Sequence, residues 1–300
     1  MQGVRRTWRA LGTGMCMTVL HGRREGAEQA VEGALVELAR VDRIMSIYRA
    51  ESQVAVLNRE GVLKNPDGYL VEVLEAAQEM SRRTAGAFDV TVQPLWEVYA
   101  AASKAGKLPE AAAVTVAVAK VDWRKVEVAA ERVALKGTGM GITLNGIAPG
   151  YAADRVMAAL RGFGVEHAMV NTGEIGTIGR KEDGSAWTVG VQHPRRADAF
   201  VAVAKLEGRC MATSGDYETS FSADHGYNHI FDPATGRSPE GFSSVTVVAS
   251  TGTEADALST AVFVLGYEKG LKLIESTKGA AALFVLKDGR VLATDGFPRA

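Results

Sequence analysis

The sequence predicts an α+β protein, and three observations support that class. Apolar residues recur every three or four positions over two long segments, 25–47 and 67–85, as they do in helices packed against a core. Segments of strand composition gather in the second half of the chain and do not alternate regularly with helices. They lie at 168–171, 187–191, 200–206 and 245–250. Finally, 47% of the 300 residues are hydrophobic and 23% are charged, which is ordinary for a globular chain.

The first half of the chain is expected to be mainly helical. Its helices are expected at 25–47, from Asp67 to 85, and at 94–102. Polar residues predict an irregular loop at 46–58, and an alanine-rich connection runs to Val118. Its strands are expected at 13–20, entered from a turn at Leu11-Gly12, and in a hairpin at 125–128 and 132–135.

In the second half of the chain, helices and strands are expected without a regular alternation. Glycines cluster between Gly137 and Gly150, and a helix then runs through Leu160. Pro149 suits the first turn of that helix, where a missing N–H leaves no hydrogen bond unmade. A further helix at 253–265 and a hairpin at 281–286 and 290–293, turning at Asp288-Gly289, end the chain. Since no repeat or linker marks a boundary, we expect one domain over residues 1–300.

Composition excludes several classes of function. The chain has 34 Lys plus Arg against 35 Asp plus Glu, a formal net charge of −1, which leaves no basic surplus for a nucleic-acid groove. Its two cysteines, Cys16 and Cys210, are too few for a disulfide framework or a thiolate zinc site. No stretch reaches the ~18–20 apolar residues that a membrane-spanning helix needs. Arg5-Arg6 before an apolar run would suit a twin-arginine signal, but Arg9 interrupts the run and favours a strand instead.

The glycine cluster leads directly into a helix, which leaves two interpretations open. A glycine loop at a helix N-terminus exposes backbone N–H groups that suit a phosphate. However, no Walker lysine follows and the G-x-G-x-x-G order is absent, which favours turn and packing chemistry as the explanation of the cluster.

A second candidate site lies in the helix at 253–265. Asp256 and Thr260 are four residues apart and therefore share one helix face. A carboxylate and a hydroxyl are oxygen ligands suited to Mg²⁺, which water and a substrate phosphate complete. The alternative is a capping box with Thr253 as N-cap and Asp256 as its partner, and the two interpretations are compatible.

Two further groups of polar residues carry weaker signals. Ser214 and Asp216 lie upstream of His229, but no Gly-x-Ser-x-Gly elbow encloses the serine, so a hydrolase triad is unsupported. Asp89 precedes a helix and is suited to cap it. Tyr48 is an aromatic residue in a polar loop, which is suggestive of ring stacking.

Eight short motifs follow one another through almost the whole chain. They are Leu11-Gly12-Thr13; Ser46-Ile47-Tyr48 with Ser52 and Leu57-Asn58; Phe88-Asp89-Val90-Thr91; Gly146-Ile147-Ala148 with Gly150-Tyr151-Ala152 and Asp154; Asn171-Thr172-Gly173-Glu174; 212–218; His229-Ile230 with Asp232-Pro233 and Thr235-Gly236; and 255–261. Each is weak alone, but the ordered set resembles the ApbE family, the FAD:protein FMN transferases. The resemblance implies a T-fold-related α+β architecture with mixed strands, flanking helices and a flavin site between two halves.

The resemblance also implies a reaction and the residues that serve it. FAD is split at its diphosphate, FMN passes to a threonine or serine hydroxyl of a partner flavoprotein, and AMP leaves. Mg²⁺ would be held by Asp256, Thr260 and the main-chain carbonyl of Ala148. His229 would orient or deprotonate the attacking hydroxyl, with Asp256 as the second catalytic residue. The residues implied to contact the cofactor are Met15, Tyr48, Ala87, Phe88, Asp89, Thr143, Gly146, His229 and Ile230.

This chain departs from the family pattern at three positions. Thr143 replaces an aspartate, Pro149 replaces a lysine, and Thr172 replaces a glycine. The Leu-Asn-Gly-Ile-Ala-x-Gly-Tyr sequence at 144–151 is similar to the sequence in the branch of the family linked to nitrous oxide reductase maturation. This resemblance implies a membrane electron-transfer subunit as acceptor. An FAD pyrophosphatase and a non-catalytic flavin-delivery protein are the alternatives. The family implies a periplasmic location, although these residues show no signal for it, and a cytoplasmic location is the alternative.

Overall fold

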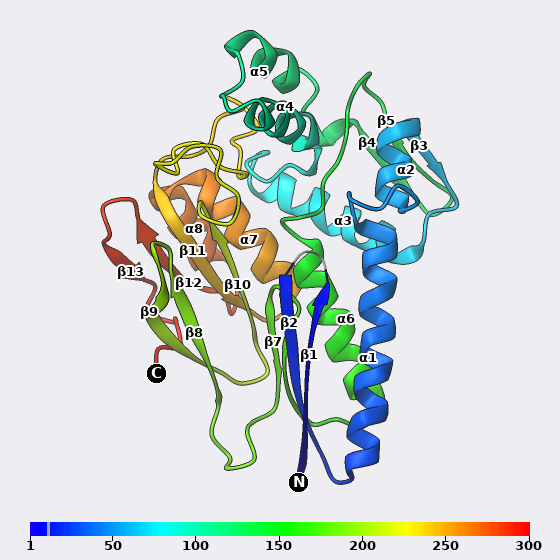
Figure 1. Ribbon diagram of the computed structural model, residues 1–300, viewed down its shortest axis with the longest axis vertical. Coiled ribbons are helices and arrows are strands. Elements are labelled where there is room, and N and C mark those ends of the chain that lie inside the picture. The colour runs from blue at the N-terminus through cyan, green and yellow to red at the C-terminus, as the bar shows by residue number, and fades with distance from the viewer. Residues whose placement is uncertain (11–12) are drawn as a thin grey trace.

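The computed structural model describes residues 1–10 and 13–300, and it confirms the α+β class (Figure 1). Its main sheet has eight strands in the order β1-β2-β6-β7-β10-β11-β12-β13, with neighbouring strands antiparallel. The strands are β1 (Gln2–Ala10), β2 (Thr13–His21), β6 (His167–Asn171), β7 (Ile175–Ile178), β10 (Cys210–Gly215), β11 (Phe242–Ala249), β12 (Ala281–Leu286) and β13 (Val291–Ala293). The pairing of β2 with β6 brings the two halves of the chain into one sheet.

Helices cover one face of this sheet (Figure 1). They are α1 (Arg24–Met45), α6 (Ala148–Gly162), α7 (Gly252–Leu265) and α8 (Tyr267–Ser276). Alternate strand residues, such as Val245 and Val247 of β11, point into the core that these helices form with the sheet. Val248 points the other way. The helices α6 and α7 lie against each other as well as against the sheet.

A hairpin covers part of the opposite face. It consists of β8 (Trp187–His193) and β9 (Arg196–Leu206). Val191 and Leu206 of the hairpin share an apolar cluster with Val248. Because β11 has apolar layers on both sides, all eight of its residues are buried.

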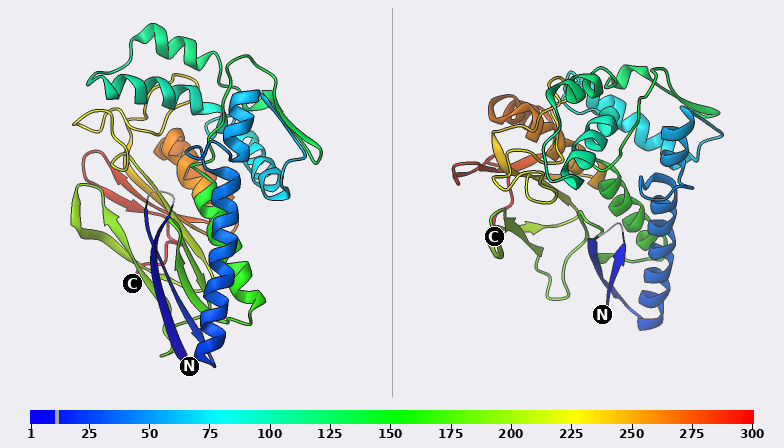
Figure 2. Two further views of the ribbon diagram at one scale, coloured as in Figure 1. Left: turned by 45° about the vertical axis from the view of Figure 1, so that its right-hand side comes forward. Right: turned by 45° about the horizontal axis from the view of Figure 1, so that its top comes forward.

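The remaining elements form a region at the end of the molecule away from both termini (Figure 2). They are α2 (Gln53–Glu60), α3 (Gly68–Arg83), α4 (Gln93–Lys104), α5 (Ala111–Val118), the 3₁₀ helices η1 (Val90–Val92) and η2 (Trp123–Lys125), and a small sheet of β3 (Val62–Lys64), β5 (Arg132–Leu135) and β4 (Val126–Ala129). Residues 216–241, between β10 and β11, contain no helix or strand. This 216–241 segment packs against α4 and α5, where the rings of Tyr99 and Phe231 are 5.0 Å apart.

Two sequence predictions for this region are wrong. The predicted loop at 46–58 contains α2, which Ser52 caps by accepting a hydrogen bond from the N–H of Ala55 at 3.0 Å. Only Val54 and Leu57 of this short helix are buried, so its apolar pattern is too brief to recognise. The alanine-rich connection likewise contains α5, of which only Ala117 is buried.

Besides α2 and α5, the strands β1, β3, β7 and β10 and the helix α8 were not predicted. In β1, Val4 is the one residue classed as buried among 2–8, because this strand lies at the edge of the sheet and most of its side chains face solvent. Among the residues that the structure describes, no helix combines the length and the apolar character needed to cross a bilayer.

Candidate active site

A cavity of about 530 Å³ lies where α6, α7 and β10 meet. This volume is within the range of roughly 300–1,000 Å³ that is typical of small-molecule sites. Its lining residues come from segments that are far apart in the chain. They fall within 87–92, 143–149, 171–175, 189–192, 211–218, 229–233 and 256–264. The site is therefore assembled only by the tertiary fold.

Two helix N-termini meet beside this cavity, and each is capped by an aspartate of the other helix. Asp154 of α6 accepts hydrogen bonds from the backbone N–H groups of Gly252 at 2.7 Å and Thr253 at 2.8 Å. Asp256 of α7 accepts one from the N–H of Gly150 at 2.9 Å. The backbones touch here, since a Cβ added at Gly150 would lie 2.1 Å from the carbonyl oxygen of Gly252. Glycine packing therefore fixes Asp256 relative to α6.

Asp256 and Thr260 lie one turn apart on α7, and both line the cavity. Asp256 is 4% exposed. Burial raises the pKa of its carboxyl to about 7, and the negative charge of Asp154 adds to the increase. The hydroxyl oxygen of Thr260 is 3.1 Å from that of Ser214. The structure thus places the predicted pair of oxygen ligands on one cavity wall.

The predicted capping box at the start of α7 is wrong. The N-cap is Thr251, whose hydroxyl oxygen accepts a hydrogen bond from the N–H of Glu254 at 3.2 Å. The hydroxyl of Thr253 instead donates to Asp154 at 2.6 Å. Asp256 is directed toward the neighbouring helix, a contact across distant parts of the chain that local spacing does not reveal.

Glu174 is a site residue that the sequence analysis missed. It lies in the turn between β6 and β7, lines the cavity, and accepts a hydrogen bond from the N–H of Thr213 at 3.1 Å. Burial raises the pKa of its carboxyl well above the usual value, and the charges of Asp256 and Glu218 add to the increase. The Gly-Glu motif at 173–174 was the available signal, but spacing does not show where a turn side chain points.

The charge of the cavity wall is one-sided. Asp89, Glu174, Glu218 and Asp256 are among its lining residues, whereas no lysine or arginine is found among the described residues that line it. An anionic ligand would be repelled here unless a cation accompanied it. Carboxylate and hydroxyl oxygens are the ligands that Mg²⁺ prefers, so the site fits that ion.

No group of three or more His, Cys, Asp or Glu side chains suited to a metal occurs within residues 1–10 and 13–300. One carboxylate and one hydroxyl, those of Asp256 and Thr260, would therefore supply only part of a coordination sphere. Mg²⁺ commonly keeps several waters and takes phosphate oxygens from its ligand, so this small set of protein donors is compatible with it.

Residues 87–92 and Thr143 contribute another part of the cavity wall. The carboxylate of Asp89 accepts hydrogen bonds from the N–H and the hydroxyl of Thr91, at 2.8 and 2.6 Å, and from the N–H of Trp123 at 3.1 Å. The N–H of Thr143 donates to the carbonyl of Val90 at 2.8 Å. The predicted residues Ala87, Phe88, Asp89, Thr143 and Gly146 all line the cavity. Since protein donors occupy its oxygens, Asp89 stabilises the shape of this wall.

His229 lines the cavity from the 216–241 segment, next to Ile230. Its Nδ1 is 3.3 Å from the carbonyl oxygen of Thr219. A carbonyl oxygen only accepts, so Nδ1 carries the hydrogen in this contact and Nε2 presents a lone pair. Burial lowers the pKa of the ring, which keeps it neutral near pH 7. A neutral imidazole of this kind can take a proton from a hydroxyl group.

Three predicted site residues are not among those that line the cavity. Met15 is 2% exposed within the core, and the side chain of Tyr48, just after α1, is 71% exposed. Ala148 is the first residue of α6. Their predicted roles, as FAD contacts and as a carbonyl ligand, stay predictions. The motif residues Leu11 and Gly12 lie outside the described residues.

The fold and the cavity define an α+β protein with an acidic pocket of small-molecule size. The chain belongs to the ApbE family, whose family model matches residues 11–284. It is 31% identical to the FAD:protein FMN transferase of Treponema pallidum, over 95% of this chain and 85% of that protein.

Solved structures agree with this assignment. The ApbE protein from Thermotoga maritima superposes with a TM-score of 0.89 at 31% identity, covering 100% of both chains. The flavinyl transferase ApbE from Pseudomonas stutzeri, in its apo form, gives a TM-score of 0.85 at 29% identity, covering 98% of this chain and 95% of that one. The predicted α+β fold class is therefore confirmed.

Proposed function

We propose that this protein transfers FMN from FAD to a threonine or serine hydroxyl of a partner flavoprotein and releases AMP. The observation that carries the proposal is a single cavity that combines a neutral histidine, His229, with the buried carboxyl of Asp256. The relatives named as FAD:protein FMN transferases support the choice of FAD as substrate and of a protein as acceptor.

Mg²⁺ is part of this proposal because of the charges in the cavity. The diphosphate of FAD would meet carboxyl groups without a lysine or arginine from the described lining residues to offset them. Asp256 and Thr260 would hold the ion, since only Oδ2 of Asp256 is engaged, by the N–H of Gly150. The carbonyl of Ala148 remains the proposed third protein ligand. The ion would neutralise charge on the diphosphate, the main requirement of phosphoryl transfer.

In this proposal His229 carries out the proton transfer. Nε2 takes the proton of the acceptor hydroxyl, because Nδ1 already carries a hydrogen toward the carbonyl of Thr219. The hydroxyl oxygen forms a bond to the phosphorus of the FMN half of FAD. The bond from that phosphorus to the bridging oxygen breaks, and AMP leaves with this oxygen and its negative charge. Atoms and charge balance without any oxidant or reductant.

The three departures from the family pattern bear on what attacks the diphosphate. Thr143, Pro149 and Thr172 all line the cavity. Thr143 and Pro149 stand where the resemblance implies an aspartate and a lysine, so two charges are absent beside the diphosphate. Water in place of the acceptor hydroxyl would make the same site an FAD pyrophosphatase, and this is the alternative that the experiment has to separate.

The nature of the acceptor and the compartment are further parts of the proposal. We propose a membrane electron-transfer subunit as acceptor and a periplasmic location. Both rest on the resemblance of the motifs to the family and on its branch linked to nitrous oxide reductase maturation. Tagging the chain in its own cell and measuring its distribution between periplasmic and cytoplasmic fractions tests the location.

One incubation tests the function. The protein is mixed with FAD, Mg²⁺ and a peptide carrying an Asp-x-x-Thr-Gly-Ala-Thr acceptor sequence, and AMP and covalently bound flavin are measured. AMP together with flavin-labelled peptide is the expected result. AMP with free FMN would indicate hydrolysis, and binding of FAD without AMP would indicate a flavin carrier; either outcome contradicts the proposal.

Two variants test the assigned roles within that assay. Asp256→Ala is expected to abolish labelling, because the carboxylate on the metal side is lost. His229→Ala is expected to lower the labelling rate by about 10²–10⁴-fold, the usual contribution of a general base. If His229→Ala labels the peptide at the unchanged rate while Asp256→Ala does not label it, the role given to His229 is wrong.

A further inference from the structure

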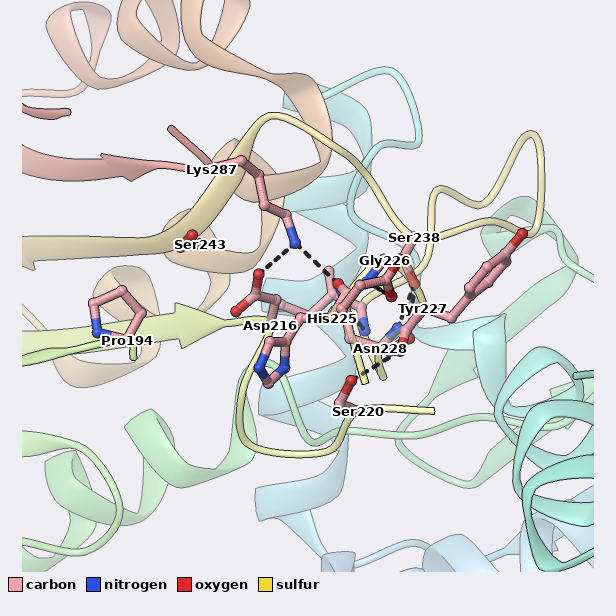
Figure 3. Close-up of polar contacts among 12 residues, drawn as sticks. Pro194, Asp216, Ser220, His225, Gly226, Tyr227, Asn228, Ser238, Ser243 and Lys287 are labelled. Atoms are coloured by element: carbon pink, nitrogen blue, oxygen red, sulfur yellow. Dashed lines mark hydrogen bonds and ion pairs between the residues drawn. The ribbon is translucent and has the colours of Figure 1, made fainter. Parts of the chain in front are cut away.

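A buried ionic cluster lies at the start of the 216–241 segment, outside the cavity lining. The side chain of Asp216 is 0% exposed. Its carboxylate accepts hydrogen bonds from both terminal nitrogens of Arg195, at 2.6 and 2.7 Å. It also pairs with the ammonium of Lys287 at 2.5 Å (Figure 3). Arg195 comes from the turn between β8 and β9, and Lys287 directly follows β12. Two strand ends therefore converge on the first residue of the segment.

Lys287 makes a second contact that Arg195 does not make. Its ammonium also donates to the carbonyl oxygen of His225 at 2.9 Å, in the middle of the 216–241 segment (Figure 3). His225 has a backbone φ of +57°, an unusual conformation for a residue with a side chain. Lys287 thus connects the sheet to a strained point of the segment through a charge-assisted hydrogen bond.

The carbonyl of His225 connects in turn to the residue beside His229. It also accepts a hydrogen bond from the side-chain amide of Asn228 at 3.3 Å. The amide oxygen of Asn228 accepts one from the N–H of Ile230 at 3.0 Å. The Asn228 side chain therefore contacts the backbone both before and after His229. A continuous set of polar contacts therefore runs from Lys287 to the backbone around the histidine.

We infer that Lys287 is a positioning residue for His229. It holds the His225 carbonyl, and with it the turn that carries Asn228 and His229, at a fixed place relative to the sheet. The 216–241 segment has no helix or strand of its own, so polar contacts of this kind determine its conformation. The inference rests on the proposed function, because the effect on rate requires His229 to act on the acceptor hydroxyl.

Removing Lys287 releases this turn without breaking the cluster. In Lys287→Met, Asp216 keeps both hydrogen bonds from Arg195, so no buried charge is left unpaired. Methionine also replaces most of the apolar stem of the lysine. The His225 carbonyl, in contrast, loses its charged donor. Asp216→Asn would be a poorer test, since it leaves two cations facing a neutral amide.

The test compares Lys287→Met with the wild-type protein in two measurements. The first is FMN transfer to the acceptor peptide at saturating Mg²⁺, which we expect to show kcat about ten- to a hundredfold lower with the KM for FAD changed less than twofold. The second is amide hydrogen exchange of the peptide that covers His229. Its N–H is bonded to the carbonyl of Thr219, and we expect its exchange to become faster.

Two matched variants complete the design. Lys272→Met removes an exposed lysine of α8, for which the described part of the chain gives no ion pair, and it should change neither measurement. Lys287→Arg keeps a charged donor and should restore much of the rate. If Lys287→Met does not fold, Lys287→Gln replaces it, because its amide ends one atom short of the lysine nitrogen and cannot hold both partners.

The outcomes separate this inference from the function it rests on. If the wild-type protein labels no peptide, the proposed function fails, and the exchange measurement still decides whether Lys287 holds the turn. If the wild-type protein labels the peptide and Lys287→Met does so with the same kcat, the inference is overturned. Unchanged exchange at His229 overturns it as well, whether or not transfer occurs.

Discussion

The two sides of the cavity are held in place by different kinds of interaction. On one side, Asp256 and Thr260 stand on α7, whose backbone touches that of α6 at Gly150 and Gly252 with no room for a side chain between them. On the other side, His229 stands on the 216–241 segment, which has no helix or strand and is held by hydrogen bonds, ion pairs and aromatic contacts.

This difference indicates how the proposed chemistry is divided. The groups assigned to the metal ion are fixed by backbone packing, which a single side chain cannot replace. The proposed base is fixed by polar side-chain contacts, which single substitutions can remove while the core stays intact. Substitutions on the α6–α7 side should therefore act mainly on stability and metal binding, and those on the 216–241 side mainly on rate.

The largest effect is expected from Gly150→Ala. Its Cβ would lie 2.1 Å from the carbonyl oxygen of Gly252, so the two helices have to separate. We expect the free energy of unfolding to fall by about 3 kcal/mol, at the upper end of overpacking costs. Chemical denaturation followed by circular dichroism measures it. Gly162→Ala, in the same helix with nothing within 4 Å, is the control and should be neutral or stabilising.

If Gly150→Ala were as stable as Gly162→Ala, the close contact of the two helices would not hold Asp256, and the comparison between the two sides would lose its basis. A loss of stability with the Mg²⁺ dependence of FMN transfer unchanged would limit the role of the glycine contact to folding alone.

A smaller loss of stability is expected from Gly236→Ala on the other side. Gly236 has φ +68°, and its Cβ would meet side chains of Val118, Val114 and Leu95 at 2.6–2.9 Å. Side chains move more readily than backbone, so we expect a total cost of about 2 kcal/mol, half of it from the left-handed backbone. Gly61→Ala, at φ +72° with nothing within 4 Å, measures the backbone part alone.

The comparison also predicts how Gly236→Ala affects activity. Pushing the 216–241 segment away from α4 and α5 should lower kcat and leave the Mg²⁺ concentration at half-maximal rate unchanged. A shift in that Mg²⁺ concentration would show that the two sides of the cavity are mechanically coupled, contrary to the division described above.

The sequence predicted those parts of the site that depend on residues close together in the chain, and it missed those that depend on contacts between distant residues. Asp256 and Thr260 were recognised because their spacing lies within one helix, and α7 itself has a long apolar pattern. Glu174 was missed because it lies in a turn, and the spacing of residues in the sequence does not show that this turn directs the side chain into the cavity. The reciprocal caps by Asp154 and Asp256 join residues about a hundred positions apart, which local spacing does not register.

The fold shows the same limit. Long helices such as α1 and α3 repeat their apolar stripe often enough to be predicted, whereas α2 and α5 bury too few residues. The edge strand β1 has mostly exposed side chains and so lacks the alternation of a buried strand. The ordered motifs predicted the family, which is confirmed. The single domain over residues 1–300 stays a prediction.

A moderate effect on metal binding is expected from Thr260→Val, which removes one proposed oxygen ligand at nearly constant volume. The Mg²⁺ concentration at half-maximal rate should rise about tenfold, equivalent to ~1.4 kcal/mol, while the rate at saturating Mg²⁺ falls little. Thr260→Ser keeps the hydroxyl and should restore the wild-type dependence. An unchanged Mg²⁺ dependence in the valine variant would remove Thr260 from the proposed site.

The finest distinction between the two sides is their response to pH. Burial lowers the pKa of His229 below its usual value of 6.5, so the neutral form of the base predominates at pH 7 and is lost as the pH falls below 6.5. Burial raises the pKa of Asp256 to about 7 without a metal ion, so protons compete with Mg²⁺ as the pH falls through 7.

The pH profile of FMN transfer at several Mg²⁺ concentrations separates these two titrations. At low Mg²⁺ we expect the rate to fall already below pH 7, and saturating Mg²⁺ should remove this decline because it keeps Asp256 ionised. The decline that remains should lie below pH 6.5 and should be missing in His229→Ala. If the remaining decline persists in that variant, another group acts as the base, and the 216–241 side of the cavity serves only to bind the substrates.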